Sequence, residues 1–183
     1  MTPFKRRQAT QILKAGGIVA CPTEAVYGLS CDPLQQSAVE RLLMIKNRDV
    51  DKGLILVASA IDQLPAFVSI PANNRDIIVN SWPGPATWLL PASSDAPAWI
   101  RGDHDTIAMR ITAHPAMSAL CESFGRCLVS TSANLTGLPP AKSALQVQLQ
   151  LGHKLDLILH AALGASHKPT TIRDAISGKK IRG

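Results

Sequence analysis

The chain has 183 residues, a usual length for one domain and a short one for two. Apolar residues make up 46% and charged residues 17%, so the chain can form a packed core and is not mainly disordered. Lysine and arginine total 19 against 13 acidic residues, a net charge of +6. This excess favours an anionic partner such as a nucleotide, tRNA or an acidic metabolite, with charge that serves solubility alone as the alternative.

The cysteines and the N-terminus bear on metal binding and location. The four cysteines form no Cys-x-x-Cys pair, and the five histidines have no ligand spacing, so we expect no protein-bound metal site. The start, MTPFKRR, lacks the apolar stretch of a signal peptide, and no apolar run approaches the roughly 20 residues of a membrane span. We therefore expect a cytoplasmic protein with reduced thiols and no membrane contact.

The first third of the chain alternates between helix and strand. A helix is predicted over residues 4–15, where two glycines stop it, followed by a buried strand over 18–21 that Pro22 breaks. Residues 22–33 have no clean period and are predicted as an ordered loop. A helix over 37–46 and a continuous apolar strand over 53–57 follow.

The same alternation continues to the C-terminus. Further helices are predicted over residues 71–82, 116–124 and 143–151, and further strands over 87–91, 106–112, 127–131 and 155–159, before a short basic tail. Strands alternating with helices indicate an α/β sheet covered on both faces. No repeat or long linker divides the chain, so we expect one domain over residues 1–183.

The common nucleotide-binding and hydrolase motifs are absent from the sequence. It contains no Gly-x4-Gly-Lys-Ser/Thr loop, no Gly-x-Gly-x-x-Gly, no Gly-x-Ser-x-Gly and no His-Glu-x-x-His. Any phosphate chemistry must therefore use side-chain cations and loop amides.

Three cations gather where the second predicted helix ends. Lys46, Arg48 and Lys52 lie within seven residues, just before an apolar strand. They repel one another unless they are solvated or face an anion, and the fork of an arginine suits the oxygens of a triphosphate. The alternative is a helix C-terminus whose cations complement the helix dipole. Spacing alone leaves both interpretations open.

Two polar segments follow predicted strands. In STSANLTG, Ser132 and Asn134 alternate by two and point the same way if the chain is extended, at the strand end where open α/β sheets bind ligands. The segment PTEAVYG carries the only tyrosine of the chain and a carboxylate, Glu24, beside a predominantly apolar loop. An ordinary structural turn is the alternative for both segments.

Together these segments resemble a known family. PTEAVYGLSCDP, KNRDVDKGLIL, SWPGPATWLLPA, TIAMRITAHP and VSTSANLTGLPP follow one another in the order of the YrdC/TsaC family of threonylcarbamoyl-AMP synthases, from about residue 18 to residue 140, with a weaker match in PTTIRD. The resemblance implies the short bacterial form: a single YrdC-like α/β domain with a twisted, mostly parallel or mixed sheet flanked by helices and a basic concave cavity.

The resemblance also implies an activity. Family members condense L-threonine, bicarbonate and ATP to L-threonylcarbamoyladenylate and pyrophosphate, and a separate threonylcarbamoyl-transferase complex then modifies tRNAs that read codons starting with A. Mg²⁺ is expected to arrive with ATP. Members have also been described as binding double-stranded RNA.

Matching positions imply roles for individual residues. The catalytic cations implied are Lys46, Arg48 and Lys52. Contacts with ATP are implied for Arg48, Lys52, Thr106, Ser130, Ser132, Asn134, Pro140, Thr170 and Arg182. Contacts with threonine are implied for Thr23, Ala25 and Arg110. Ala25 stands where many members have a threonine, and Val57 where a histidine is common.

The cluster of cations is what a catalyst that acts by electrostatic stabilisation needs. A carbamate made from threonine must attack the α-phosphorus of ATP, and attack of one anion on another needs charge neutralisation and alignment more than a protein nucleophile. The rival hypothesis is a non-catalytic double-stranded RNA or tRNA-binding or ribosome-maturation module, contacting RNA through the net charge and the basic tail from Lys168 to Arg182. A hydrolytic ATPase is less favoured, because no water-activating base accompanies the cations.

Overall fold

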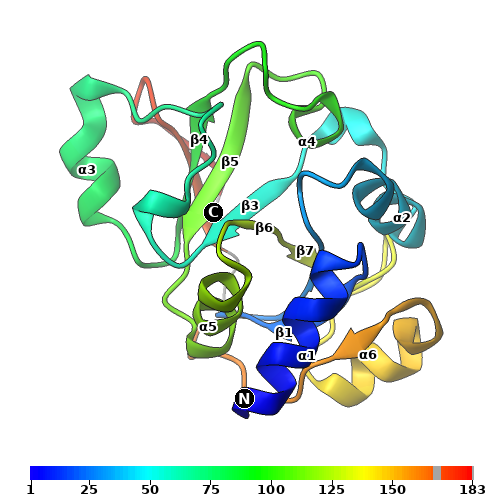
Figure 1. Cartoon of the computed structure of the whole chain (residues 1–183). Coiled ribbons are helices and arrows are strands. Elements are labelled where there is room, and N and C mark those ends of the chain that lie inside the picture. The colour runs from blue at the N-terminus through cyan, green and yellow to red at the C-terminus, as the bar shows by residue number, and fades with distance from the viewer. Residues whose placement is uncertain (167–169, 183) are drawn as a thin grey trace.

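The computed structural model describes residues 1–166 and 170–182. Their strands form two mixed sheets with helices packed around them (Figure 1). The smaller sheet has the strand order β7-β2-β1-β8, and the larger has the order β10-β9-β4-β5-β3-β6. The expected mixed sheet flanked by helices is therefore present, divided in two, and antiparallel pairings outnumber parallel ones.

The bounds of the elements are as follows. The helices are α1 (Pro3–Lys14), α2 (Gln36–Lys46), α3 (Arg75–Asn80), α4 (Ala98–Arg101), α5 (Pro115–Phe124) and α6 (Ala144–Leu151), with short 3-10 turns η1 (Val50–Lys52), η2 (Ile61–Gln63), η3 (Ala72–Asn74) and η4 (Gly152–Lys154). The strands are β1 (Val19–Pro22), β2 (Tyr27–Ser30), β3 (Ile55–Ala58), β4 (Ala86–Pro91), β5 (Thr106–Ile111), β6 (Leu128–Val129), β7 (Thr131–Ser132), β8 (Leu157–Ile158), β9 (Thr171–Asp174) and β10 (Lys180–Arg182).

The five predicted helices are confirmed. The hydroxyl of Thr2 accepts a hydrogen bond from the amide of Lys5 and caps α1, and Ser143 caps α6 in the same way. Gly125, with a φ of 90°, ends α5. The third predicted helix consists of η3 followed by α3. The single turn α4 was not predicted, because four residues are too few to show a helical period.

The prediction that residues 22–33 form a loop is wrong. Pro22 is the last residue of β1 and pairs with Tyr27, the first residue of β2, so the two strands form an antiparallel hairpin. Pro22 is tolerated at this end of the strand, and the turn closes through a hydrogen bond from the amide of Thr23 to the carbonyl of Val26. All four residues of β2 are buried, so the strand shows no polar–apolar alternation.

The predicted strand over residues 127–131 belongs to both sheets. β6 pairs with β3 in the larger sheet, and β7 pairs with β2 in the smaller one. Between them the amide of Ser130 donates to the carbonyl of Ile55 at 2.9 Å. This one segment therefore carries the chain from one sheet to the other.

The segment predicted as a basic tail forms two strands of the larger sheet. β9 pairs in parallel with β4, and β10 pairs with β9 as the edge of the larger sheet. The polar–apolar alternation that marks a strand is weak in this segment, because β9 is half-buried and β10 is exposed throughout. Lys168, where that prediction began, lies outside the described residues.

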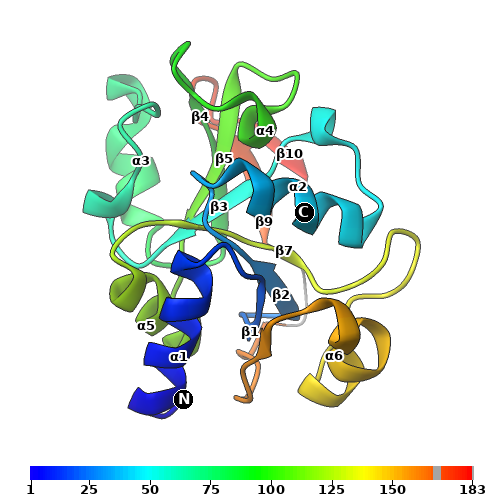
Figure 2. The same cartoon turned by 45° about the vertical axis from the view of Figure 1, so that its right-hand side comes forward.

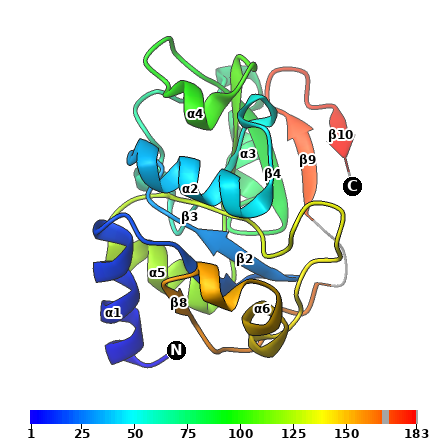
Figure 3. The ribbon, with the colours of Figure 1, turned by 90° about the vertical axis from the view of Figure 1, so that its right-hand side faces the viewer.

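The helices cover the two sheets from different sides. α1 and α5 pack together against β1, and α5 also packs against β3, so this pair spans both sheets (Figures 1 and 2). Figure 3 shows the larger sheet in the upper part, the smaller one below, and α2 and α6 on the side facing the viewer. One large apolar cluster includes residues of both sheets, α2 and α6. Within the described residues, no helix is both long and apolar enough to cross a membrane.

The loop after α4 and the η1 turn, both beside the larger sheet, are hydrogen-bonded to each other. Gly102, with a φ of 64°, ends α4, and a Cβ there would lie 2.4 Å from the carbonyl oxygen of Asp51 in η1. The amide of Asp103 donates to the same oxygen, and the amide of Leu54 donates to the carbonyl of Ile100. The conformation of the loop that carries Lys52 thus depends on this contact.

Replacing Gly102 and Gly125 separates backbone strain from steric overlap. Both have positive φ values, but nothing lies within 4 Å of a Cβ built at Gly125. Gly125→Ala should lower the unfolding free energy by about 1–2 kcal/mol. Gly102→Ala should cost at least about twice as much, because Asp51 must also move. Urea unfolding measures the loss of unfolding free energy in both variants. Equal losses would contradict the inference that the loop after α4 is packed tightly against Asp51.

Candidate active site

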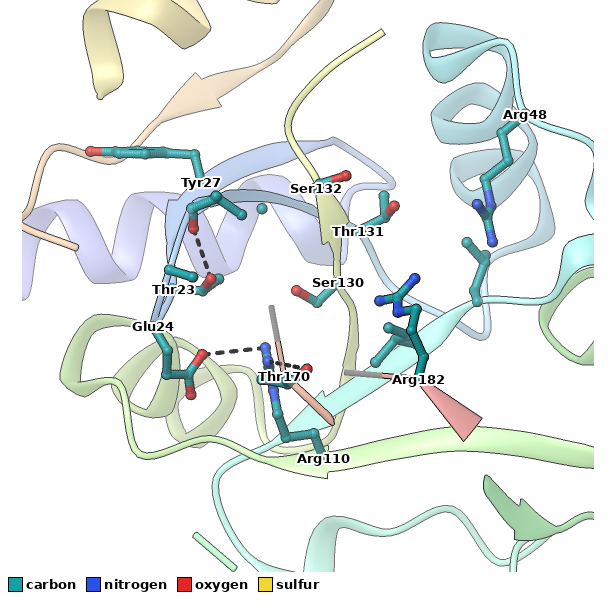
Figure 4. A pocket seen from close by; sticks show the side chains of 15 residues that line it. Thr23, Glu24, Tyr27, Arg48, Arg110, Ser130, Thr131, Ser132, Thr170 and Arg182 are labelled. Carbon is teal, nitrogen blue, oxygen red and sulfur yellow. Dashed lines mark hydrogen bonds and ion pairs between the residues drawn. The ribbon is translucent and has the colours of Figure 1, made fainter. Parts of the chain in front are cut away.

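A cavity of about 210 Å³ opens between the two sheets. Its wall comes from the β1–β2 turn, the start of β3, β5, the crossing segment around Ser130 and the C-terminal strands (Figure 4). Eight of the predicted site residues line it: Thr23, Ala25, Arg48, Arg110, Ser130, Ser132, Thr170 and Arg182. Residues from distant parts of the sequence therefore meet in one place.

The buried end of the cavity holds Arg110. This β5 residue is 8% exposed, and its Nη2 atom lies 3.4 Å from Oε2 of Glu24 in the β1–β2 turn. Its Nη1 atom donates to Oγ1 of Thr170 at a long 3.4 Å, and its Nε atom has no hydrogen-bond partner. Burial lowers the pKa of Arg110, and the charge of Glu24 opposes that shift. The guanidinium thus stays charged, with donor capacity to spare.

Glu24 is held in its ionised form. Burial by itself raises the pKa of this carboxyl, but the charge of Arg110 and a hydrogen bond from Thr112 outweigh it, so the pKa lies below its usual value. Oγ1 of Thr112 donates to Oε1 of Glu24 at 2.6 Å. Nothing in the sequence alone assigns this carboxylate a role, because its partners lie more than 80 residues away.

Two further arginines lie at the open side of the cavity. Asn47, with a φ of 48°, turns the chain at the end of α2, and Arg48 then donates from Nη2 to the carbonyl of Gly53 at 2.8 Å. Arg182 comes from β10. Burial and the charge of Arg182 lower the pKa of Arg48, although an arginine stays protonated at neutral pH. Within the described residues neither makes an ion pair, so this pair of cations suits an anionic ligand.

Lys46 lies outside the cavity, although the resemblance implied a catalytic role. Its side chain is 4% exposed, and Nζ donates to the carbonyl of Ser132 at 2.5 Å, the carbonyl of Asn134 at 2.9 Å and Oδ1 of Asn134 at 3.2 Å. Burial, followed by the nearby charge of Arg48, lowers the pKa of Lys46 to about 8. Lys46 therefore fastens α2 to the Ser132–Asn134 segment.

Asn134 also shapes this segment. Its Oδ1 atom accepts a hydrogen bond from Ser132 at 2.6 Å, and its Nδ2 atom donates to the carbonyl of Leu138 at 2.7 Å. It lines neither this cavity nor the two that adjoin it. Of the predicted pair, Ser132 faces the cavity and Asn134 holds the loop.

Two further cavities adjoin the first. One, of about 240 Å³, shares Arg48 and Arg182 with it and contains Lys52 and Thr106. Another, of about 580 Å³, shares Ala25, Ser132 and Arg182 and contains Pro140. Arg182 lines all three. Apart from Asn134, the remaining predicted contacts with ATP thus line cavities beside the central one.

The fold and site define an α/β protein with a small-molecule cavity between two mixed sheets, three arginines and one buried glutamate in its lining. The family model Sua5/YciO/YrdC, described as telomere recombination, matches residues 11–182. The chain belongs to this family.

Comparison with individual relatives supports the same family membership. The chain is 46% identical over 180 residues to a threonylcarbamoyl-AMP synthase of Nitrosococcus oceani, covering 98% of this chain and 97% of that one. It is 52% identical to another of Alkalilimnicola ehrlichii, covering 98% and 95% of the two chains. P. abyssi Sua5 complexed with L-threonine superposes with a TM-score of 0.88 and 33% identity; the match covers 95% of this chain and 52% of Sua5, so this chain spans about half of that protein.

Replacing Lys46 tests its role in holding the loop. Lys46→Met leaves the carbonyls of Ser132 and Asn134 without their charged donor, so the unfolding free energy should fall by about 1–3 kcal/mol. Lys14→Met, at an exposed position of α1, should change it by less than about 0.5 kcal/mol. Denaturant unfolding of both variants measures this, and equal values would show that Lys46 does not fasten the segment.

Proposed function

We propose that this protein is an L-threonylcarbamoyladenylate synthase, which condenses L-threonine, bicarbonate and ATP and releases pyrophosphate. The observation that carries the proposal is the pairing of Arg110 with Glu24 in a cavity whose open side holds Arg48 and Arg182. This cavity offers one site for a carboxylate and, at its other end, cations for a phosphate. Two relatives at 46% and 52% identity, both named threonylcarbamoyl-AMP synthase, support the same function.

The buried end is proposed to bind the amino acid. Arg110 has unused N–H donors and meets the carboxylate of threonine, while Thr23 and Ala25 surround the rest of the substrate. L-threonine is the ligand of the P. abyssi Sua5 complex, which supports an amino-acid site in this fold.

The open side is proposed to bind ATP. Arg48 and Arg182 face the α-phosphate, Lys52 and Thr106 lie in the adjoining cavity toward the leaving phosphates, and Ser132 and Pro140 lie in the other adjoining cavity toward the nucleoside. Thr170 borders Arg110, and Thr170 and Ser130 contact ATP near the boundary between the two substrates. Lys46 and Asn134 act by holding the Ser132 segment.

The chemistry then needs alignment and charge neutralisation. The amine of threonine adds to bicarbonate with loss of water, and gives a carbamate. A carbamate oxygen forms a bond to the α-phosphorus, and the bond from that phosphorus to the bridging oxygen breaks with its electron pair on pyrophosphate. The arginines offset the repulsion between the two anions.

The remaining parts of the proposal concern partners and organisation. MgATP enters as the substrate; within the described residues no group of three or more His, Cys, Asp or Glu side chains is arranged so that it could hold a metal ion. The adenylate passes to a threonylcarbamoyl-transferase complex that acts on tRNA, in the cytoplasm. The apolar cluster shared by both sheets supports a single YrdC-like domain over residues 1–183.

Dependence on bicarbonate tests the proposal. The protein, given ATP, L-threonine and labelled bicarbonate, should form a labelled adenylate and release pyrophosphate only when all three are present. If pyrophosphate forms equally well after carbon dioxide is removed, the protein is an ordinary amino-acid adenylating enzyme.

The same assay addresses the rival RNA-binding module. The net charge of +6 favours that candidate, which binds double-stranded RNA or tRNA without ATP and releases no pyrophosphate with threonine. RNA binding accompanied by a complete lack of threonine-dependent turnover would favour it.

Replacing Arg48 tests the phosphate side. Arg48→Gln should lower kcat/KM by roughly 10- to 150-fold, the value of a charge-assisted hydrogen bond expressed in the transition state. Arg75→Gln removes an equal charge from an exposed position of α3 and should leave kcat/KM within about two-fold. Similar losses in the two variants would mean that only net charge matters.

A further inference from the structure

Glu24 is a buried carboxylate that is only partly satisfied. The residue is 9% exposed, and Oε2 accepts no hydrogen bond although it lies 3.4 Å from Nη2 of Arg110. Buried polar atoms nearly always have partners, so an exception calls for an explanation. A buried ion pair is also weak support for stability, because removing both charges from water offsets much of their attraction. Stability alone is thus a poor explanation for Glu24.

The surroundings of Glu24 leave it little freedom. Its backbone carbonyl accepts a hydrogen bond from the amide of Ser166, and a Cβ at Gly164 would lie 2.8 Å from its Cα atom. Its Oε1 atom accepts from Thr112, whose Oγ1 in turn accepts from the amide of His114. The segment 164–166 therefore holds the backbone of Glu24 while Thr112 holds its carboxylate, and Arg110 is the only cation paired with that carboxylate within the described residues.

Among the residues that the structure describes, Arg110 has no other strong restraint. Its remaining hydrogen bond, to Thr170, is long at 3.4 Å, and its Nε atom has no partner. A guanidinium on a flexible stem must be held in one orientation to meet a carboxylate with two parallel hydrogen bonds. Figure 4 shows Glu24 and Arg110 facing each other at the same end of the cavity.

We propose that Glu24 is a positioning residue that orients the guanidinium of Arg110 and thereby sets the affinity of the cavity for the carboxylate of the amino-acid substrate. The inference rests on the proposed function, in which Arg110 binds that carboxylate. Glu24 acts through Arg110 and does not touch the α-phosphate, which binds at the other end of the cavity to Arg48 and Arg182, neither of which forms an ion pair within the described residues. Its loss should therefore weaken binding of threonine and leave binding of the nucleotide unchanged.

The test compares two carboxylates that are both buried and paired with an arginine. Glu24→Gln keeps an oxygen to accept from Thr112 but removes the charge. Asp32→Asn does the same for a fully buried residue that pairs with Arg126 and lines none of the three cavities. Titration calorimetry with L-threonine and, separately, with a non-hydrolysable ATP analogue measures binding, and thermal unfolding measures stability.

Glu24→Gln should raise the Kd for threonine about ten-fold or more, with the Kd for the ATP analogue within about two-fold. Asp32→Asn should leave both values unchanged even if it unfolds at a lower temperature. Loss of both affinities in Glu24→Gln, or an unchanged threonine Kd, overturns the positioning role. If the wild type forms no threonylcarbamoyladenylate but still binds threonine, the proposed function fails separately.

A double-mutant cycle shows whether Glu24 acts through Arg110. In an Arg110→Met background the guanidinium is gone, so adding Glu24→Gln should change the Kd for threonine by less than about two-fold. The double variant should also melt at a higher temperature than Arg110→Met alone, because the single variant leaves a buried charge unpaired. An undiminished effect of Glu24→Gln without the arginine would show that the carboxylate contacts the ligand independently.

Discussion

The ion pair between Glu24 and Arg110 links the two sheets at the point where the cavity forms. Glu24 belongs to the hairpin turn of the smaller sheet, and Arg110 to a central strand of the larger one. A buried pair of this kind contributes little net stability, but it restricts which relative placements of its two elements leave no charge unpaired. The position of the Arg110 end of the cavity, where we propose that the substrate carboxylate binds, thus follows from how the two sheets meet.

A second connection between the sheets shapes the side of the cavity where we propose that ATP binds. The segment from β6 through Ser130 to β7 passes from one sheet to the other, so Ser130 and Ser132 reach the cavity from a chain that both sheets hold. Lys46 then ties that segment to α2, and the next turn of the chain brings Arg48 to the cavity. Lys46 bonds two carbonyls and a side-chain amide oxygen, so it supports the proposed nucleotide site by holding this segment in place.

Part of the site was predictable from the residues themselves, because Arg48 follows a helix whose apolar face is plain in the sequence and Ser132 follows an apolar strand. Arg110 was implied only by the family resemblance, since one arginine inside an apolar strand carries no functional signal of its own. The features that could not be predicted depend on contacts between distant segments of the chain. β2 lacks alternation because it is buried on both faces, Glu24 finds its partners more than 80 residues away, and Lys46 looks like a surface cation until the loop that buries it is in place.

The most direct test of this account is a crystal structure of the protein with L-threonine and a non-hydrolysable ATP analogue. The account predicts the threonine carboxylate within hydrogen-bonding distance of the Arg110 guanidinium, and the α-phosphate beside Arg48 and Arg182. Threonine bound outside this cavity, or with its carboxylate against Arg48 and Arg182 while Arg110 contacts only Glu24, would contradict it.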